Sequence, residues 1–81
     1  MDAKDKVMSS EIKSKIVLVI KREGGKLSFK DIKDLVDVSV DTLKLQLADL
    51  VVDGVIKKYE GKYALTEIGE EIGELLLKRN Y

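Results

Sequence analysis

The side chains that most often carry out catalysis are missing from this chain of 81 residues, which has no His and no Cys. The first absence removes the commonest general base and metal ligand, and the second removes thiolate sites and disulfides. Carboxylates could still do chemistry, and four of them recur at helical spacings of three and four residues, where they could together hold a divalent cation. No ligand loop accompanies them, so we expect a solvated helix face, no metal, no cofactor and no enzyme activity. The four are Glu67, Glu70, Glu71 and Glu74.

Three lysines surround a Glu-Gly pair and form the second group of side chains that could act in binding. Lys57 and Lys58 precede Glu60-Gly61, and Lys62 follows it directly. If the pair forms the turn of a hairpin, the lysines project from a narrow tip, where they can contact the phosphates of a nucleic acid. Lysines on hairpins also often stay solvated and keep strands from pairing edge to edge. The sequence leaves both roles open.

The charge of the whole chain is balanced, with 15 Lys and Arg against 15 Asp and Glu. This balance argues against a strongly basic protein that coats nucleic acid. It hides an uneven distribution, however. Residues 1–33 carry nine basic and five acidic side chains, a net charge of +4, whereas residues 34–81 carry six and ten, a net charge of −4. A local basic patch for a polyanion therefore remains available.

The length and the hydrophobic content of 44% are typical of one small folded domain. The longest apolar run, Ile16 to Ile20, is far shorter than the roughly 20 residues that cross a bilayer. Residues 1–6 have mixed charge and lack the pattern of a signal peptide. We therefore expect a cytoplasmic protein with no membrane association, in which residues 1–8 are a flexible N-terminus and residues 9–81 form a single domain.

Three helices are expected in the first two thirds of the domain. The first runs to about residue 23, where two glycines end it, the second spans about 28–36, and the third spans 39–53. A serine stands at the start of each helix, where its hydroxyl can accept a hydrogen bond from a free N–H of the first turn. These serines are Ser9 or Ser10, Ser28 and Ser39.

Two runs with strand character follow, at residues 55–59 and 62–66, and the Glu-Gly pair joins them. A two-residue loop with Gly in second place suits a tight hairpin. If the residues that flank the loop pair with each other, Ile56 lies opposite Leu65 and both can face the core. Thr66 then caps a last helix that carries acidic residues first and basic residues last, in the order that complements the helix dipole.

Helix, helix–turn–helix, hairpin and helix follow one another in the order of a winged helix–turn–helix domain. The stretch from Leu27 to Ile72 resembles the ArsR/MarR-like winged-helix transcriptional regulators. The resemblance is carried by Ser39 and Thr42 at the start of the third helix, by VDGVI at 52–56 and by YALTEIG at 63–69. It implies a mostly helical α+β fold with a three-helix core, a two-stranded wing and a C-terminal helix, and a DNA-binding regulator.

The resemblance also implies which residues would contact double-stranded DNA. In such regulators the third helix lies in the major groove, and the wing touches phosphates or the minor groove. The implied positions are Lys30 in the second helix, Ser39, Thr42, Lys44, Leu45 and Gln46 in the third helix (39–53), and Lys57, Lys58 and Lys62 in the wing (55–66).

The third helix departs from this pattern because its surroundings are acidic. Residues 34–53 hold five Asp and a single Lys, a net charge of −4, which opposes the approach of phosphates. An alternative function is therefore a winged-helix module for protein–protein interaction. In that case the acidic and apolar outer face of the helix would meet a basic, apolar protein groove. This face carries Asp41, Leu45, Ala48, Asp49 and Val52.

Surplus apolar residues on two helices predict a homodimer through the first and last helices. Val17 and Leu18 lie off the main apolar stripe of the first helix, and Leu77 lies off that of the last. Gly69 and Gly73 weaken the last helix, but small residues let another backbone come close. The alternative is that these stripes pack on the core of their own domain.

Overall fold

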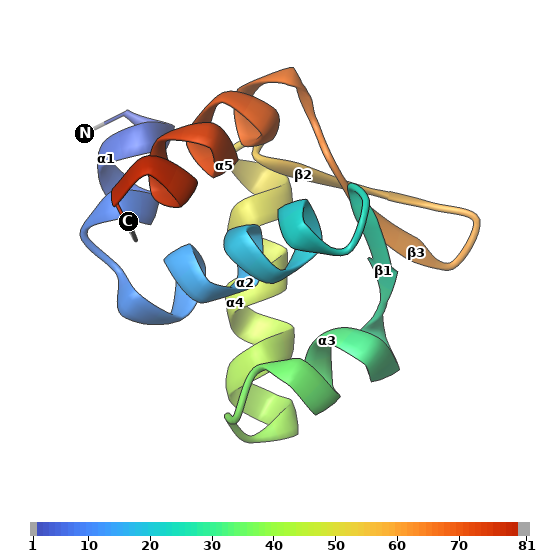
Figure 1. Cartoon of the computed structure of the whole chain (residues 1–81). Helices are drawn as coiled ribbons and strands as arrows, with labels where there is room; N and C mark the ends of the chain where they lie inside the picture. The colour runs from blue at the N-terminus through green and yellow to red at the C-terminus, as the bar shows by residue number, and fades with distance from the viewer. Residues whose placement is uncertain (1, 80–81) are drawn as a thin grey trace.

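The computed structural model describes residues 2–79, in which five helices pack together and a small antiparallel sheet lies at one side of them (Figure 1). The sheet has the strand order β1-β3-β2, and the hairpin of β2 and β3 projects from the helical body. This is the expected mostly helical α+β architecture. The elements are α1 (Ala3–Met8), α2 (Glu11–Arg22), β1 (Lys26–Ser28), α3 (Phe29–Leu35), α4 (Val40–Val52), β2 (Ile56–Tyr59), β3 (Lys62–Leu65) and α5 (Glu67–Arg79).

Hydroxyl caps begin four of the helices, as the sequence predicts. The hydroxyl oxygens of Ser10, Ser28 and Ser39 each accept a hydrogen bond from the backbone N–H three residues later, at 3.2, 3.1 and 3.1 Å. Thr66 Oγ1 likewise accepts one from the Gly69 N–H at 3.2 Å. These bonds satisfy N–H groups that have no partner within the helix, which fixes where α2, α3, α4 and α5 begin.

The N-terminal segment differs from the flexible tail that was expected for residues 1–8. Ala3–Met8 form the helix α1, and the Asp2 side chain caps it by accepting a hydrogen bond from the Asp5 N–H at 2.9 Å. Val7 is 1% exposed and belongs to the core. Ala3 and Met8 are partly buried against the same core, so α1 packs on the domain through apolar residues that the mixed charge of the segment did not reveal.

The core lies where α2, α4, α5 and the sheet meet. Val17 is completely buried in it, so this residue is not a surplus contact for a partner, and Leu18 is half-buried against the same cluster. No helix within residues 2–79 is long and apolar enough to cross a membrane. The core residues are Val7, Ile16, Val17, Ile20, Leu27, Ile32, Val36, Leu43, Leu47, Leu50, Val55, Ile56, Leu65, Ile72 and Leu76.

The two glycines of α5 do allow a close approach, but to the protein's own chain. A Cβ at Gly69 would lie 2.1 Å from the Val55 carbonyl oxygen, and one at Gly73 would lie 3.1 Å from the Lys21 side chain. The expectation that these glycines serve a second copy is therefore corrected. They let α5 lie directly on α2 and on the residue before β2.

The register of the wing is the expected one. Ile56 pairs with Leu65, and the Tyr59 and Lys62 pair closes the hairpin. Glu60 and Gly61 have φ values of 50° and 79°, both left-handed, as a two-residue turn of this kind requires. The expected two-stranded wing gains a third strand, because β1 pairs with β3 through the whole stretch Lys26–Ser28.

Candidate nucleic-acid interface

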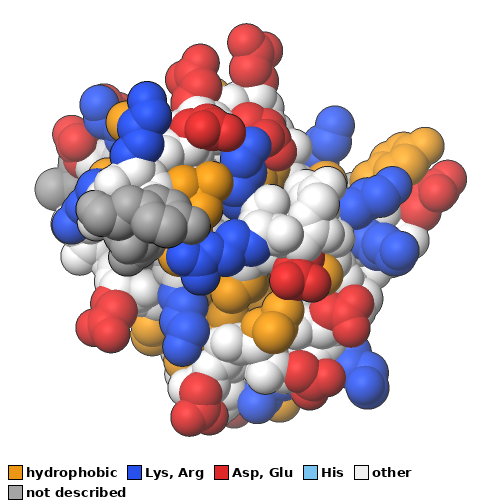
Figure 2. Space-filling model, viewed as in Figure 1, with side chains coloured by type: hydrophobic (Ala, Val, Ile, Leu, Met, Phe, Trp, Pro, Cys, Tyr) orange, Lys and Arg blue, Asp and Glu red, His pale blue; other side chains and the backbone are white. Residues whose placement is uncertain are grey.

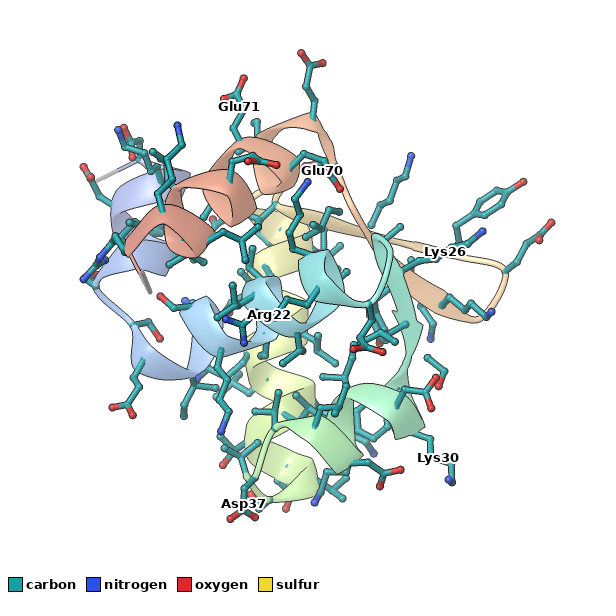
Figure 3. All side chains as sticks on the ribbon, viewed as in Figure 1. Arg22, Lys26, Lys30, Asp37, Glu70 and Glu71 are labelled. Atoms are coloured by element: carbon teal, nitrogen blue, oxygen red, sulfur yellow. The ribbon has the colours of Figure 1, made fainter. Side chains whose placement is uncertain are left out.

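Three lysines from three different strands share the outer face of the sheet, which we call the lysine face: Lys26, Lys57 and Lys62. Lys26 of β1 and Lys57 of β2 both pair with Ala64 of β3, so the three side chains lie on the same face of the sheet. Lys62 is two residues before Ala64 on β3, and side chains two residues apart along a strand share a face, so Lys62 lies there too. All three are exposed, and within residues 2–79 none takes part in an ion pair. Lys26 is labelled beside the hairpin in Figure 3.

The third lysine of the wing, Lys58, lies on the opposite face of the hairpin. It pairs with Tyr63, and its Nζ lies 5.6 Å from the centre of the Tyr63 ring, a distance at which the ring attracts a cation. The structure therefore does not bring the three predicted wing lysines to one surface. Lys57 and Lys62 lie on the outer face together with Lys26, whereas Lys58 turns toward α4.

A groove of about 630 Å³ separates α4 from the wing, and we call it the α4–wing groove. Its floor is apolar, and the only charged side chains among its lining residues are Lys44 and Lys58. A cavity with apolar walls and two cations suits a ligand that combines negative charge with apolar surface. The lining residues are Phe29, Lys44, Leu47, Ala48, Val51, Val52, Lys58 and Tyr63.

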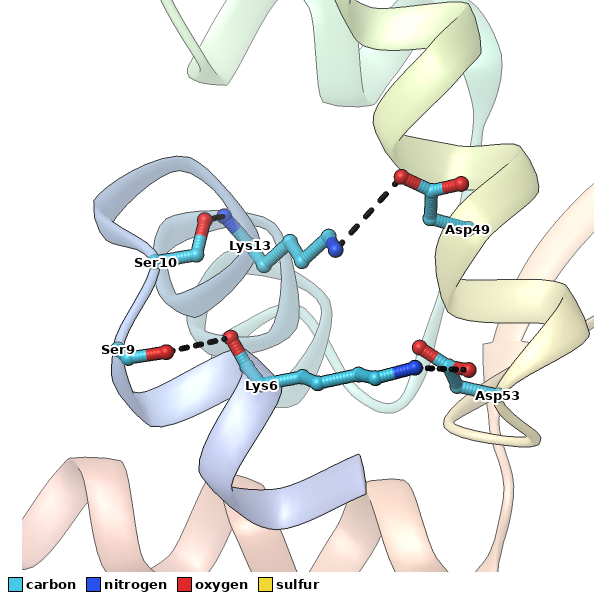
Figure 4. A network of polar contacts seen from close by, with 6 residues as sticks. All are labelled: Lys6, Ser9, Ser10, Lys13, Asp49 and Asp53. Carbon is cyan, nitrogen blue, oxygen red and sulfur yellow. Dashed lines mark hydrogen bonds and ion pairs between the residues drawn. The ribbon is translucent and has the colours of Figure 1, made fainter. Parts of the chain in front are cut away.

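The acidic residues at the end of α4 are paired with cations of the N-terminal helices (Figure 4). Lys13 Nζ lies 3.6 Å from Asp49 Oδ2, and Lys6 Nζ lies 3.2 Å from Asp53 Oδ1. Sequence reasoning missed both lysines, because the pairs join positions 36 and 47 residues apart along the chain and no local pattern reveals them. The charge that opposes a polyanion at α4 is therefore smaller than a count along the sequence indicates.

Lys30 is an exposed residue of the first turn of α3, and Figure 3 shows it at the edge of the molecule, away from α5. Its Nζ lies 3.6 Å from Asp34 Oδ2, and the two side chains are 86% and 65% exposed. An ion pair this exposed contributes little free energy, so Lys30 can exchange it for a phosphate.

The predicted contact residues of α4 divide into available and engaged side chains. The Ser39 hydroxyl donates to Thr42 Oγ1 at 2.9 Å while it caps the helix, so Ser39 is engaged, and Thr42 keeps its own O–H as a donor. Gln46 is half-buried, and its Oε1 is buried without a hydrogen-bond partner among the described residues. Lys44 and Leu45, the latter 61% exposed, are the predicted residues that α4 presents to solvent.

The carboxylates of α5 gather on another part of the molecule. In Figure 2 they form the red group at the top, whereas blue lysines lie over the hairpin on the right. Glu70 and Glu74 lie 2.6 and 3.1 Å from Lys21 Nζ, and these hydrogen bonds raise the pKa of Lys21 above its ordinary value of 10.5. Two of the four predicted carboxylates are thus bound to a lysine. Residues 2–79 contain no cluster of side chains that could hold a metal ion.

Comparison with known proteins bears on both fold and family. A solved structure described as a mutant of TubR from type III plasmid segregation has a TM-score of 0.73 and 18% sequence identity. The match covers 95% of this chain and 86% of that one. At this identity the likeness establishes the fold alone, and it confirms the winged-helix fold class. No curated protein matches the chain.

Residues 4–78 match the family described as the N-terminal domain of methanogenesis regulatory protein FilR1. This match confirms the coarser part of the resemblance seen in the sequence, a winged helix–turn–helix regulator, without favouring ArsR or MarR regulators in particular. Because it extends over nearly the whole chain, the chain belongs to the family of the FilR1 N-terminal regulatory domain.

Proposed function

We propose that this chain is a non-catalytic, cytoplasmic transcription regulator that binds double-stranded DNA through α4 and the wing. The observation that carries the proposal is the lysine face. Three exposed cations from three strands, without ion-pair partners in the described part of the chain, lie on the sheet that forms the wing, the element that touches phosphates in winged-helix proteins. The family membership, which is regulatory by its description, supports the same function.

Each part of the surface has its own role in the proposal. Lys57 and Lys62 hold phosphates from the wing, and Lys30 holds one from the start of α3. Lys44 stands at the edge of α4, where it can reach a phosphate or a guanine. Leu45 lies on the side of the helix opposite the core and faces the base edges. Because each neutralised phosphate releases counterions, binding must weaken steeply as salt is added.

The test is a fluorescence anisotropy titration of a labelled, randomised pool of duplexes at low salt. The proposal expects binding that is lost as the salt concentration rises, because the contacts are charge pairs with phosphates. No binding to any duplex of the pool would sink it.

A second candidate function, a protein-interaction module, is favoured by the exposure of Leu45 at 61% and Val52 at 84%. The structure changes the partner that would fit. Asp49 is bound to Lys13, and the charges that line the groove beside these apolar residues are lysines, so an acidic, apolar partner suits the surface better than a basic one. The variant Lys57→Ala/Lys62→Ala separates the candidates: it weakens DNA binding, because these lysines hold phosphates, and it leaves capture of a protein partner by α4 unchanged, because they lie on the sheet face away from α4.

The expected homodimer through the first and last helices belongs to the same proposal in a narrower form. Of the residues that suggested it, Val17 is buried, and the α5 residues Ile68 and Leu75 now provide the exposed apolar surface, at 46% and 39%. They are seven residues apart and share one face of the helix. We propose this face as the contact between two copies.

A further inference from the structure

The outer face of α4 presents methyl groups where a DNA-reading helix often presents hydrogen-bonding side chains. Leu45 is 61% exposed, Val52 is 84% exposed, and Ala48 lies exposed between them on the same side of the helix. These three residues, which we call the methyl face, follow one another at spacings of three and four. Burial of Leu43 and Leu50 on the other side fixes this face outward.

The polar side chains of α4 have few groups left for base edges. The Ser39 hydroxyl donates to Thr42 Oγ1, which leaves the Thr42 O–H as one donor, and Asp49 and Asp53 are ion-paired with Lys13 and Lys6. The half-buried Gln46 has its carbonyl oxygen turned inward. Two further polar residues, Asp41 and Lys44, are exposed beside the methyl face.

We propose that α4 recognises the C5-methyl groups of thymine in the major groove, so that the preferred DNA is thymine-rich where the methyl face meets it. This inference rests on the proposed DNA-binding function. The thymine methyl is the one apolar group that a base pair presents in the major groove, and contact with aliphatic side chains is the direct way to read it. Cytosine presents an amino group there and no methyl.

The charges around the methyl face fit DNA as its occupant. Lys44 and Lys58 line the adjoining groove between α4 and the wing, so the apolar strip has cations along one side. A phosphate backbone that runs along one side of a row of methyl groups has the complementary arrangement. Along the helix axis, Leu45 and Val52 are about 10 Å apart. That distance corresponds to about three base steps.

The experiment removes the methyl groups from the DNA rather than from the protein. The tightest-binding duplex is selected from a randomised pool and synthesised again with deoxyuridine in place of every thymidine, which leaves base pairing intact. Burial of one methyl group stabilises a contact by enough to change affinity about fourfold. We expect the wild-type protein to bind the uracil duplex about fourfold more weakly for each methyl group contacted.

The protein side of the test uses the variant Leu45→Ala/Val52→Ala. Both side chains are exposed, so the fold should persist, and circular dichroism checks this. The variant should bind the thymine and uracil duplexes with nearly equal affinity. The matched control is Leu35→Ala in α3, which removes a 44% exposed leucine outside the methyl face and should keep the full difference.

Three results would count against the inference, and they can be told apart. Equal affinity of the wild-type protein for the thymine and uracil duplexes overturns it and leaves DNA binding intact. A full difference in Leu45→Ala/Val52→Ala overturns it as well, because the preference then comes from the shape of the DNA. Absence of binding to every duplex overturns the proposed function and this inference together.

Discussion

Lys6 Nζ lies 3.2 Å from Asp53 Oδ1, and this ion pair ties α1 to the C-terminal end of α4. A second pair between Lys13 and Asp49 lies one turn of α4 away, so two cations of the N-terminal helices face two acids of the helix expected at DNA (Figure 4). The segment before the winged-helix core therefore changes the electrostatics of the proposed reading helix. Without these lysines, two carboxylates would face the phosphates unpaired.

Removing both lysines should weaken DNA binding. We expect Lys6→Ala/Lys13→Ala to lower affinity severalfold at low salt, because Asp49 and Asp53 then repel the phosphates without a neighbouring cation. Anisotropy titration measures the change, and Lys4→Ala is the control, because Lys4 is an exposed residue of α1 outside these pairs.

A reciprocal change separates neutralisation from direct contact. Adding Asp49→Asn and Asp53→Asn to the lysine variant should restore most of the affinity, because the unpaired carboxylates are then gone. If the variant with all four substitutions binds as weakly as the variant with the two lysine substitutions, the lysines contact DNA themselves and the neutralisation account is wrong.

The two glycines of α5 should respond differently to alanine. At Gly69 the new Cβ would meet a backbone oxygen 2.1 Å away, which cannot move without shifting the chain, so Gly69→Ala should lower the free energy of unfolding by about 3 kcal/mol. At Gly73 it would meet the aliphatic carbons of Lys21 at 3.1 Å, a contact that a small shift relieves, and the gain in helix propensity of about 1 kcal/mol offsets the crowding. Urea unfolding compares them, and equal destabilisation would contradict the packing described for α5.

Lys21 should make stability depend on pH at the alkaline end. Its hydrogen bonds to Glu70 and then Glu74 raise the pKa of Lys21 above 10.5 in the folded state. The stabilisation is therefore fully present below the unfolded pKa and is lost as the pH rises through the folded pKa. Around neutral pH, Lys21→Met should have a lower free energy of unfolding than the wild type, and the difference should not change with pH there. Urea unfolding should show this difference shrinking above pH 10.5. A difference that grows there would contradict the role of the ion pairs.

The exposed face of α5 should decide the oligomeric state. We expect the wild-type protein to sediment at twice its chain mass of 9.1 kDa and Ile68→Lys/Leu75→Lys to sediment as a single chain with unchanged circular dichroism. Burying two aliphatic side chains is favourable, and burying two lysines is not. A wild-type protein that stays at 9.1 kDa at high concentration would refute the dimer.

The parts of the fold that the sequence predicted are those set by local interactions. The caps at Ser28 and Ser39 act over three residues, and the pairing of Ile56 with Leu65 follows from the turn and the alternation of the strands. Val7 and Lys6 were not predicted to have tertiary roles, because the contact of Lys6 lies 47 residues away. Such contacts depend on how the helices pack, which neither spacing nor composition reveals.

The candidate site shows the same division. Alternation along the strands places Lys57 and Lys62 on one face and Lys58 on the other, and the structure has this arrangement. The addition of Lys26 to that face depends on the pairing of β1 with β3, and a three-residue strand gives only a weak signal. The negative charge that α4 presents to DNA was overestimated, because the lysines that pair with its Asp49 and Asp53 come from α1 and α2.

The salt dependence of DNA binding tests the central claim most directly. Anisotropy titrations at several salt concentrations give the slope of log affinity against log salt for the wild type, Lys57→Ala/Lys62→Ala and Lys78→Ala, whose lysine is exposed on α5. We predict binding by the wild type, a slope shallower by about 1.8 in the wing variant, and an unchanged slope for Lys78→Ala. A wild type that binds no duplex, or a wing variant with the wild-type slope, would contradict DNA binding through the lysine face.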